Sequence, residues 1–206
     1  MKPLAQVLLL ALACFFGNVS ADHLHADNPV ALVEEVIGFI FSDVAEKLDV
    51  YNADHEALQT LVRTELMPVL DVDYAARLVL GPAGRGIPEE KIDEFADCMS
   101  NLLINRYSRG LLYFSSEVEV RVLPQRGDLN EKMTRVRSRV KLPKGGEAPV
   151  DYAFHKTADG WKAFDVIVEG ISYVTTYRNQ IMPDVQANGI DSVITRLNSG
   201  QIDLPE

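Results

Sequence analysis

The sequence predicts an α+β fold, in which helices pack against one face of an antiparallel β-sheet. Apolar residues follow a helical period up to about residue 111, alternate with polar residues between 117 and 168, and return to a helical spacing after 173. Neighbouring strands flanked by helical segments are typical of this class. The chain has 206 residues, of which 47% are hydrophobic and 24% charged. This composition excludes a disordered or fibrous chain and is sufficient for a globular core.

Residues 1–21 have the pattern of a secretory signal peptide. A lysine precedes the apolar run 4–16, which is shorter than the roughly 20 residues that a membrane-spanning helix needs, and small residues end the segment at Ala21. A lipoprotein signal ending at Cys14 is the alternative, but it lacks the expected large apolar residue three positions earlier. We therefore expect a cleaved signal peptide at 1–21. No linker or repeat divides 22–206, which we expect to form a single domain.

Helix start and stop signals define four helices before the strands. Asn28 followed by Pro29 is a typical helix start, and Pro88 begins the longest helix. Pro68 interrupts one helix, while Gly81 can end the next with a positive φ angle at little cost. The predicted ranges are about 28–48, 54–66, 74–80 and 88–111.

Alternation of apolar and polar residues predicts strands at 117–122, 134–142, 150–156 and 161–168. Short turns between them predict an antiparallel sheet of about four strands. In the first hairpin, the polar face is expected to set Glu117 and Glu119 opposite Arg135, Arg137 and Arg139. Two helices, at about 173–188 and 191–197, complete the chain.

The charge balance limits the partners of the protein. Twenty basic and 30 acidic residues give a net charge of −10, which disfavours non-specific binding to nucleic acid. The two cysteines, Cys14 and Cys98, cannot form a disulfide framework. After cleavage only Cys98 remains, and its place near an apolar helix stripe predicts a buried free thiol.

No motif for a catalytic nucleophile, a metal site or a cofactor stands out. His55 and His155 have no partner motif and are expected to be ordinary polar positions. Asp165 and Glu169 are predicted to share one face of the last strand with Trp161, where a pair of carboxylates could act as acid and base. Exposure on the polar face or pairing with Arg or Lys is the favoured explanation of the two carboxylates, because structural ion pairs also perturb carboxyl groups. We therefore expect no catalytic residues, no metal and no cofactor.

Two segments resemble the MlaC family of toluene-tolerance phospholipid-binding proteins. They are residues 64–81, TELMPVLDVDYAARLVLG, and residues 159–180, DGWKAFDVIVEGISYVTTYRNQ. The resemblance extends from about residue 28 to 199. The most specific matches are Trp161, Asp165, Glu169-Gly170, Ser172 and Tyr177-Arg178.

The resemblance implies a cone-shaped fold of the nuclear-transport-factor type that encloses an apolar cavity. It also implies a monomeric periplasmic carrier that holds a phospholipid as its only ligand. Such a carrier passes lipid between an outer-membrane lipoprotein–porin complex and an inner-membrane ABC transporter, and so maintains outer-membrane lipid asymmetry. By position, Ile171 corresponds to a family residue that lines the lipid cavity.

Elementary energetics agree with a carrier. About 30 methylene groups of a diacyl lipid, at about 0.8 kcal/mol each, would cost on the order of 24 kcal/mol to expose to water. A carrier therefore needs apolar residues beyond those of a closed core, although either role is possible for each residue singly. The alternatives are an isomerase or hydrolase that uses Asp165 or Glu169 as a base, and an interaction subunit with a solid core and no ligand. The candidate lipid-binding residues are Leu66, Leu70, Tyr74, Leu78, Leu103, Tyr107, Leu111, Val150, Tyr152, Phe154, Val166, Val168 and Ile171.

Overall fold

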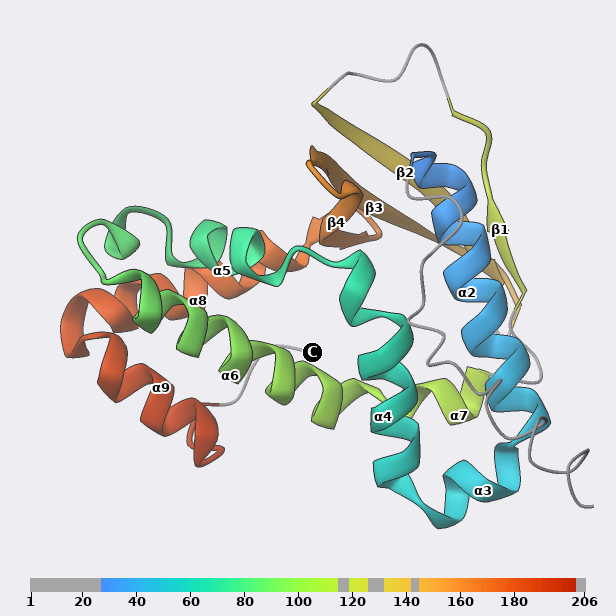
Figure 1. Ribbon diagram of the computed structural model, residues 1–206, viewed down its shortest axis with the longest axis horizontal. Coiled ribbons are helices and arrows are strands. Elements are labelled where there is room, and N and C mark those ends of the chain that lie inside the picture. Colours follow the sequence, from blue (N-terminus) through green and yellow to red (C-terminus); the bar gives the residue numbers. More distant parts are fainter. Residues whose placement is uncertain (1–26, 115–118, 126–131, 142–144, 203–206) are drawn as a thin grey trace, which may run out of the picture.

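The computed structural model describes residues 27–114, 119–125, 132–141 and 145–202 (Figure 1). The predicted signal peptide at 1–21, and Glu117 of the first predicted strand, lie outside these residues. Within them, no helix has both the length and the apolar character required to cross a membrane. The described residues confirm the α+β class and the antiparallel sheet.

The helices follow the predicted ranges closely in most places. Asn28 caps the first described helix by accepting hydrogen bonds from the backbone N–H groups of Val30 and Ala31, and Asp54 caps α4 in the same way. With η marking 3₁₀ turns, the elements are α2 (Pro29–Glu46), α3 (Leu48–Ala53), α4 (His55–Glu65), η1 (Met67–Val69), α5 (Val72–Leu80), η2 (Gly81–Gly84), α6 (Glu89–Tyr107), α7 (Gly110–Phe114), α8 (Tyr173–Asn188) and α9 (Ile190–Asn198).

The helix predicted at 88–111 is in fact two helices, α6 and α7. Ser108 ends α6, and the backbone N–H of Leu111 donates to the Ser108 carbonyl oxygen at 3.0 Å in a tight turn. Gly110 begins α7, and glycine has a low helix propensity that favours such a break. The apolar period alone did not predict this break because it continues across the turn.

The sheet has five antiparallel strands arranged in space in the order of the sequence. The strands are β1 (Val120–Val122), β2 (Met133–Lys141), β3 (Glu147–Thr157), β4 (Gly160–Val168) and β5 (Ile171–Ser172). Four correspond to the predicted strands. The fifth, β5, has only two residues and pairs with the end of β4, so it is too short to show a periodic pattern.

The register of the first hairpin differs from the expected charge pairing. Arg121 lies opposite Arg139, and Glu119 forms an ion pair with Lys141 at 3.6 Å. The arginines of β2 therefore do not face Glu119, and the expectation for this residue was wrong. In the observed register Val122 pairs with Ser138, which places Glu119 beside Lys141 instead of an arginine.

A β-bulge in β4 changes the face on which later residues of the strand lie. Ala153 pairs with Asp165 but Phe154 pairs with Ala163, so Phe164 is an extra residue in β4. Asp165 consequently lies on the sheet face opposite to Trp161. The prediction that both residues share a face was wrong, because a simple alternation does not include the extra residue.

The buried hydrophobic side chains of the described residues form two clusters. A helical cluster lies among α5, α6, α8 and α9, and contains Phe95, Ile181 and Leu197. A sheet cluster lies between α2, α4 and one face of the sheet, and contains Leu58 and Val136. The two clusters meet where the chain enters α5.

Backbone and side-chain contacts join the two clusters at this point. The backbone N–H of Asp71 donates to the Ala163 carbonyl oxygen of β4 at 2.8 Å. The carboxylate of Asp71 also contacts His155 Nε2 of β3 at 2.7 Å. These contacts attach the start of α5 to the sheet.

Candidate functional site

Six of the candidate residues share one face of the sheet. The register pairs Val150 with Val168 and Tyr152 with Val166, and Ile171 lies beside Val168. Phe154 lies on the same face, which is the one that packs against α2 and α4. Exposure increases along this face, from 2% at Phe154 to 64% at Ile171. The sheet therefore presents an apolar surface that is closed at one end and open at the other.

The helical candidates divide between the two clusters. Leu66, Leu70 and Leu111 pack against the sheet cluster, whereas Leu78 and Leu103 pack against the helical cluster. These five residues thus lie on both sides of the boundary between the clusters. The predicted set combines surfaces that the fold brings together from α4, α5, α6 and α7.

Tyr74 lies apart from this group. Its ring stacks on His155 at 4.3 Å between centroids and meets Phe164 edge-on at 5.1 Å. His155 lies on the sheet face opposite to Tyr152, because neighbouring residues of β3 alternate between faces. The structure therefore places Tyr74 in the contact that joins α5 to the sheet.

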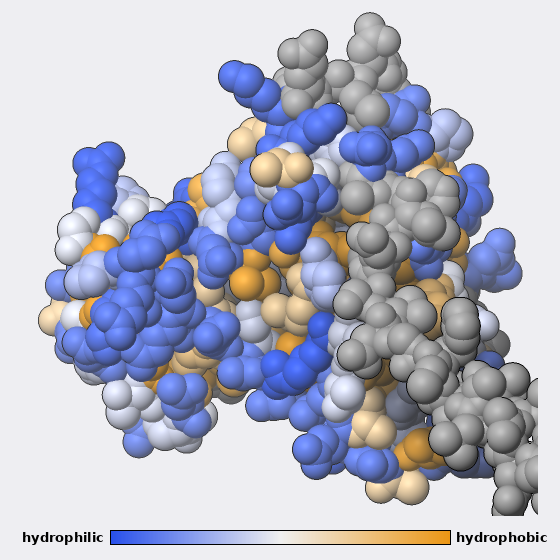
Figure 2. Space-filling model, viewed as in Figure 1, coloured by the Kyte–Doolittle hydropathy of each residue, from blue (hydrophilic) through white to orange (hydrophobic). Residues whose placement is uncertain are grey.

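Incomplete burial distinguishes the candidate residues from the two closed clusters. Phe154 is buried, while Tyr107 and Ile171 are exposed, at 38% and 64%. The other ten candidates are half-buried. Figure 2 shows apolar side chains gathered in a hollow between the two parts of the molecule. A closed core would hide such residues from solvent, so these side chains, with Tyr74 on the other side of the sheet, leave apolar area accessible.

Tyrosine hydroxyls lie near this surface. The hydroxyl oxygens of Tyr107 and Tyr177 lie 3.5 Å apart, and the Tyr173 and Tyr177 rings meet at 5.7 Å between centroids. Burial raises the pKa of Tyr152, and burial together with the Tyr107 hydroxyl raises that of Tyr177, so these two side chains are uncharged near neutral pH. A charged group beside them is Arg106, whose guanidinium lies 5.9 Å from the Tyr107 ring centroid.

Asp165 and Glu169, the two carboxylates considered as catalytic groups, lie beside the start of α8 and in a turn, respectively. Asp165 accepts hydrogen bonds from Ser172 Oγ at 2.6 Å and from the backbone N–H of Val174 at 3.0 Å. Both carboxylate oxygens thus stabilise the first turn of α8. Glu169 is exposed in a tight turn with Gly170, where its φ angle is 51°. Neither residue lies on the apolar face, so the structure gives no support to an acid–base pair there.

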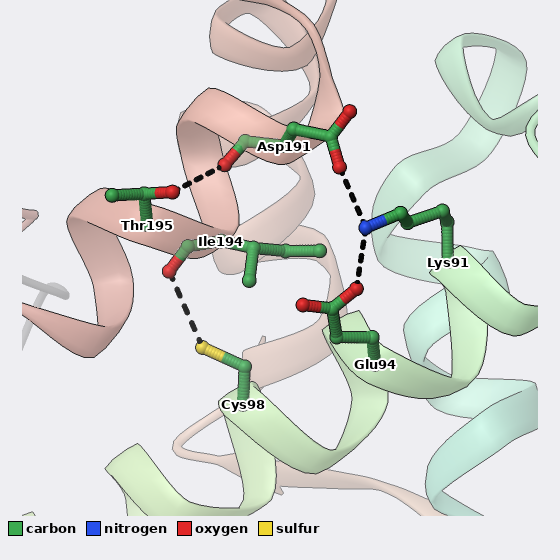
Figure 3. Close-up of polar contacts among 6 residues, drawn as sticks. All are labelled: Lys91, Glu94, Cys98, Asp191, Ile194 and Thr195. Atoms are coloured by element: carbon green, nitrogen blue, oxygen red, sulfur yellow. Dashed lines mark hydrogen bonds and ion pairs between the residues drawn. The ribbon is translucent and has the colours of Figure 1, made fainter.

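The described residues contain no group of three or more His, Cys, Asp or Glu side chains that could hold a metal ion. Cys98 is a buried free thiol, as predicted, and lies between α6 and α9 (Figure 3). Its Sγ contacts Asn198 Oδ1 at 3.2 Å, and burial raises its pKa. Nearby, Lys91 bridges Glu94 at 2.7 Å and Asp191 at 2.8 Å, which ties the two helices together.

A second apolar surface was not predicted from the sequence. A groove with a volume of about 460 Å³ lies between α2 and β1. A signal that could have indicated it is Gly38, a glycine in the middle of a strongly predicted helix. The groove is lined by Glu34, Ile37, Gly38, Phe41, Val120, Arg121 and Val122.

Comparisons with known proteins agree on one family. The family model described as MlaC protein matches residues 34–199. The chain is 24% identical over 203 residues to the intermembrane phospholipid transport system binding protein MlaC of Haemophilus influenzae, covering 96% of this chain and 92% of that protein. It is 25% identical over 167 residues to the toluene tolerance protein ttg2D of Pseudomonas putida, covering 81% and 77%.

A solved structure has the same fold. The phospholipid-binding protein from Ralstonia solanacearum, determined in complex with a phospholipid, matches with a TM-score of 0.74. The match covers 82% of this chain and 94% of that one, at 22% identity.

Proposed function

The chain belongs to the MlaC protein family, and on this premise we propose that it is a periplasmic phospholipid carrier. It would take lipid from one membrane complex and deliver it to another, between an outer-membrane lipoprotein–porin complex and an inner-membrane ABC transporter. This exchange would maintain the lipid asymmetry of the outer membrane. Residues 1–21 would be removed on export, and 22–206 would act as one monomeric domain.

The observation that carries this proposal is the half-buried apolar surface between the two hydrophobic clusters. Ten of the 13 candidate residues are neither closed into a core nor fully exposed. Unfilled apolar surface of this extent is unfavourable in water, at about 25 cal/mol per Å². Two acyl chains would cover it, and the same surface would shield them from water.

The chemistry of the surface suggests loose recognition of the head group. The favourable energy comes from acyl chains that all phospholipids share, and the tyrosines near the surface are neutral. The net charge of −10 opposes adhesion to anionic membranes. Specific docking to protein complexes would therefore decide where the lipid is exchanged.

The position of Asp165 favours a carrier over an enzyme. The alternative function needs a carboxylate that is free to act as a base, and Asp165 accepts two hydrogen bonds at the start of α8. We propose that the protein has no catalytic activity and that phospholipid is its only small-molecule ligand.

The test is native mass spectrometry of the protein starting at Asp22, purified from a bacterial periplasm without detergent. Adducts of phospholipid mass in stoichiometric amount are expected, and solvent extraction would identify them. An apo mass that stays unchanged after incubation with liposomes would contradict the carrier function.

A charged substitution tests the site within the same experiment. Ile171→Glu places a carboxylate at the open end of the apolar face and should reduce phospholipid occupancy in competition by about tenfold, equivalent to about 1.4 kcal/mol. The fold should be retained, since Ile171 is 64% exposed. Val50→Glu is the matched control, because Val50 is also apolar and 53% exposed but lies on α3. Equal lipid occupancy in the two variants would contradict the assigned role of Ile171.

A further inference from the structure

One of the two edges of the described sheet lies at β1, and the other lies at the two-residue strand β5. In the described residues β1 pairs only with β2, and Figure 1 shows it at the outer edge of the sheet beside α2. The backbone N–H of Lys141 donates to the Glu119 carbonyl oxygen at 2.9 Å, and that of Leu123 donates to the Arg137 carbonyl oxygen at 2.8 Å. These bonds direct the backbone groups of 119, 121 and 123 towards β2.

It follows that the backbone groups of Val120 and Val122 point away from the sheet. Each residue offers one N–H donor and one carbonyl acceptor along the free edge. Their side chains lie on the same face as Val136, the face that α2 covers. An unpaired edge of this kind is a template for another extended chain.

The groove between α2 and β1 lies directly beside this edge. Its apolar lining comes from Ile37 and Phe41 of α2 and from Val120 and Val122 of β1. Its volume of about 460 Å³ is within the usual range of ligand sites, about 300–1,000 Å³. A strand added to β1 would place alternate side chains in the groove.

Gly38 gives independent support. It lies in the middle of α2, where glycine costs about 1 kcal/mol relative to alanine. A Cβ atom added to Gly38 would meet nothing within 4 Å, so packing within the described chain does not require a glycine here. A molecule outside the chain that approached the backbone of α2 closely would require a glycine at this position.

We propose that the groove between α2 and β1 binds an extended segment of a partner protein, which pairs with the backbone of Val120 and Val122. An acyl chain could fill the groove, but it could not satisfy the hydrogen-bonding groups of the edge. Glu34 lines the groove and has no ion pair with another described residue, so a basic residue in the segment fits beside it. The partner is a component of one of the membrane complexes, and in this respect the inference rests on the proposed function.

The experiment measures binding of the protein starting at Asp22 to each purified membrane complex, the outer-membrane lipoprotein–porin complex and the inner-membrane ABC transporter. Val122→Pro removes an N–H that points to the free edge and leaves the bonds to β2 intact, while Val122→Ala retains the N–H. Gly38→Leu fills the groove, and Ala45→Leu is its control at an exposed position of the same helix.

Val122→Pro and Gly38→Leu should each weaken binding to one complex by about tenfold or more, while both controls stay within about twofold. All four variants should carry as much phospholipid as the unmodified protein, which also shows that they are folded. Unchanged binding of both Val122→Pro and Gly38→Leu would overturn the inference. A sedimentation result showing that the groove joins two copies of this chain would also overturn the inference. Absence of phospholipid from the unmodified protein would overturn the proposed function instead, since docking is measured separately.

Discussion

The Cys98 thiol is enclosed between α6 and α9, where it contacts the Ile194 carbonyl oxygen (Figure 3). It also lies within reach of Asn198 Oδ1. Burial raises its pKa, so little of it is in the reactive thiolate form near neutral pH. We predict that a disulfide reagent reacts with the folded protein at pH 8 roughly a hundredfold more slowly than with the protein in guanidinium chloride. The measurement uses the protein starting at Asp22, in which Cys98 is the only cysteine. Equal rates in the two states would show that the thiol is accessible.

Single residues also show where sequence patterns succeed and fail. The apolar alternation correctly placed Val150, Tyr152 and Phe154 on one face, because β3 alternates regularly along its length. Asp165 was assigned to the wrong face, since the extra residue Phe164 reverses the alternation within β4. A bulge depends on how two strands pair, and this information is not present in the periodicity of either strand.

At the level of elements, Asp184 connects α8 to α9. Its carboxylate accepts hydrogen bonds from Arg196 at 2.6 Å and from Asn188 at 2.6 Å. These bonds, led by that of Arg196, lower the pKa of Asp184 in the folded protein. A group whose pKa is lowered by folding stabilises the protein above its unfolded pKa, and this stability is lost as pH falls through the folded pKa.

We therefore predict that Asp184→Asn lowers the free energy of unfolding by about 0.5–1 kcal/mol at pH 7. The difference from the unmodified protein should shrink as the pH falls below 3.8, the ordinary carboxyl value, and is lost fully only below the lowered pKa of folded Asp184. Urea unfolding at pH 7 and pH 3 measures both values. Asp97→Asn, at an exposed position of α6, should change little at either pH. A difference of the same size at pH 3 would rule out the carboxylate as the cause.

The ends of elements could be predicted where a residue carries its own signal. Asn28, Asp54 and Gly81 mark helix ends because side-chain caps and positive φ angles are local properties. The division between α6 and α7 was not predicted because the apolar period continues across the turn at Ser108, and β5 was missed because two residues are too few to show a period. The groove beside α2 was missed for a different reason, because it exists only between two elements that are distant in the sequence.

At the scale of the whole molecule, the contact of Asp71 with His155 attaches the start of α5, a helix of the helical cluster, to strand β3 of the sheet. Trp161 is the only tryptophan and is buried in the sheet cluster, so its fluorescence reports on that cluster. Circular dichroism reports mainly on the helices. The two signals can therefore follow the two parts of the molecule separately.

We predict that the unmodified protein unfolds in urea with the same midpoint by both signals. His155→Ala removes the contact with Asp71 and the stacking on Tyr74, so it should destabilise the protein by about 1–3 kcal/mol and separate the two midpoints. Arg135→Ala is the control, because Arg135 is exposed and pairs with Asp151 only at 3.7 Å. Coincident midpoints in His155→Ala would show that other contacts are sufficient to couple the clusters.

The sequential order of the strands has a consequence for how the molecule forms. Each strand pairs with the strand that follows it, so the sheet requires no connection across the fold. Chains with such local pairing have low contact order and fold quickly, since little loop-closure entropy must be lost before a contact forms. The sheet can therefore assemble hairpin by hairpin, and each added strand covers the open edge of the strand before it, so that among the described strands only the edges at β1 and β5 stay unpaired.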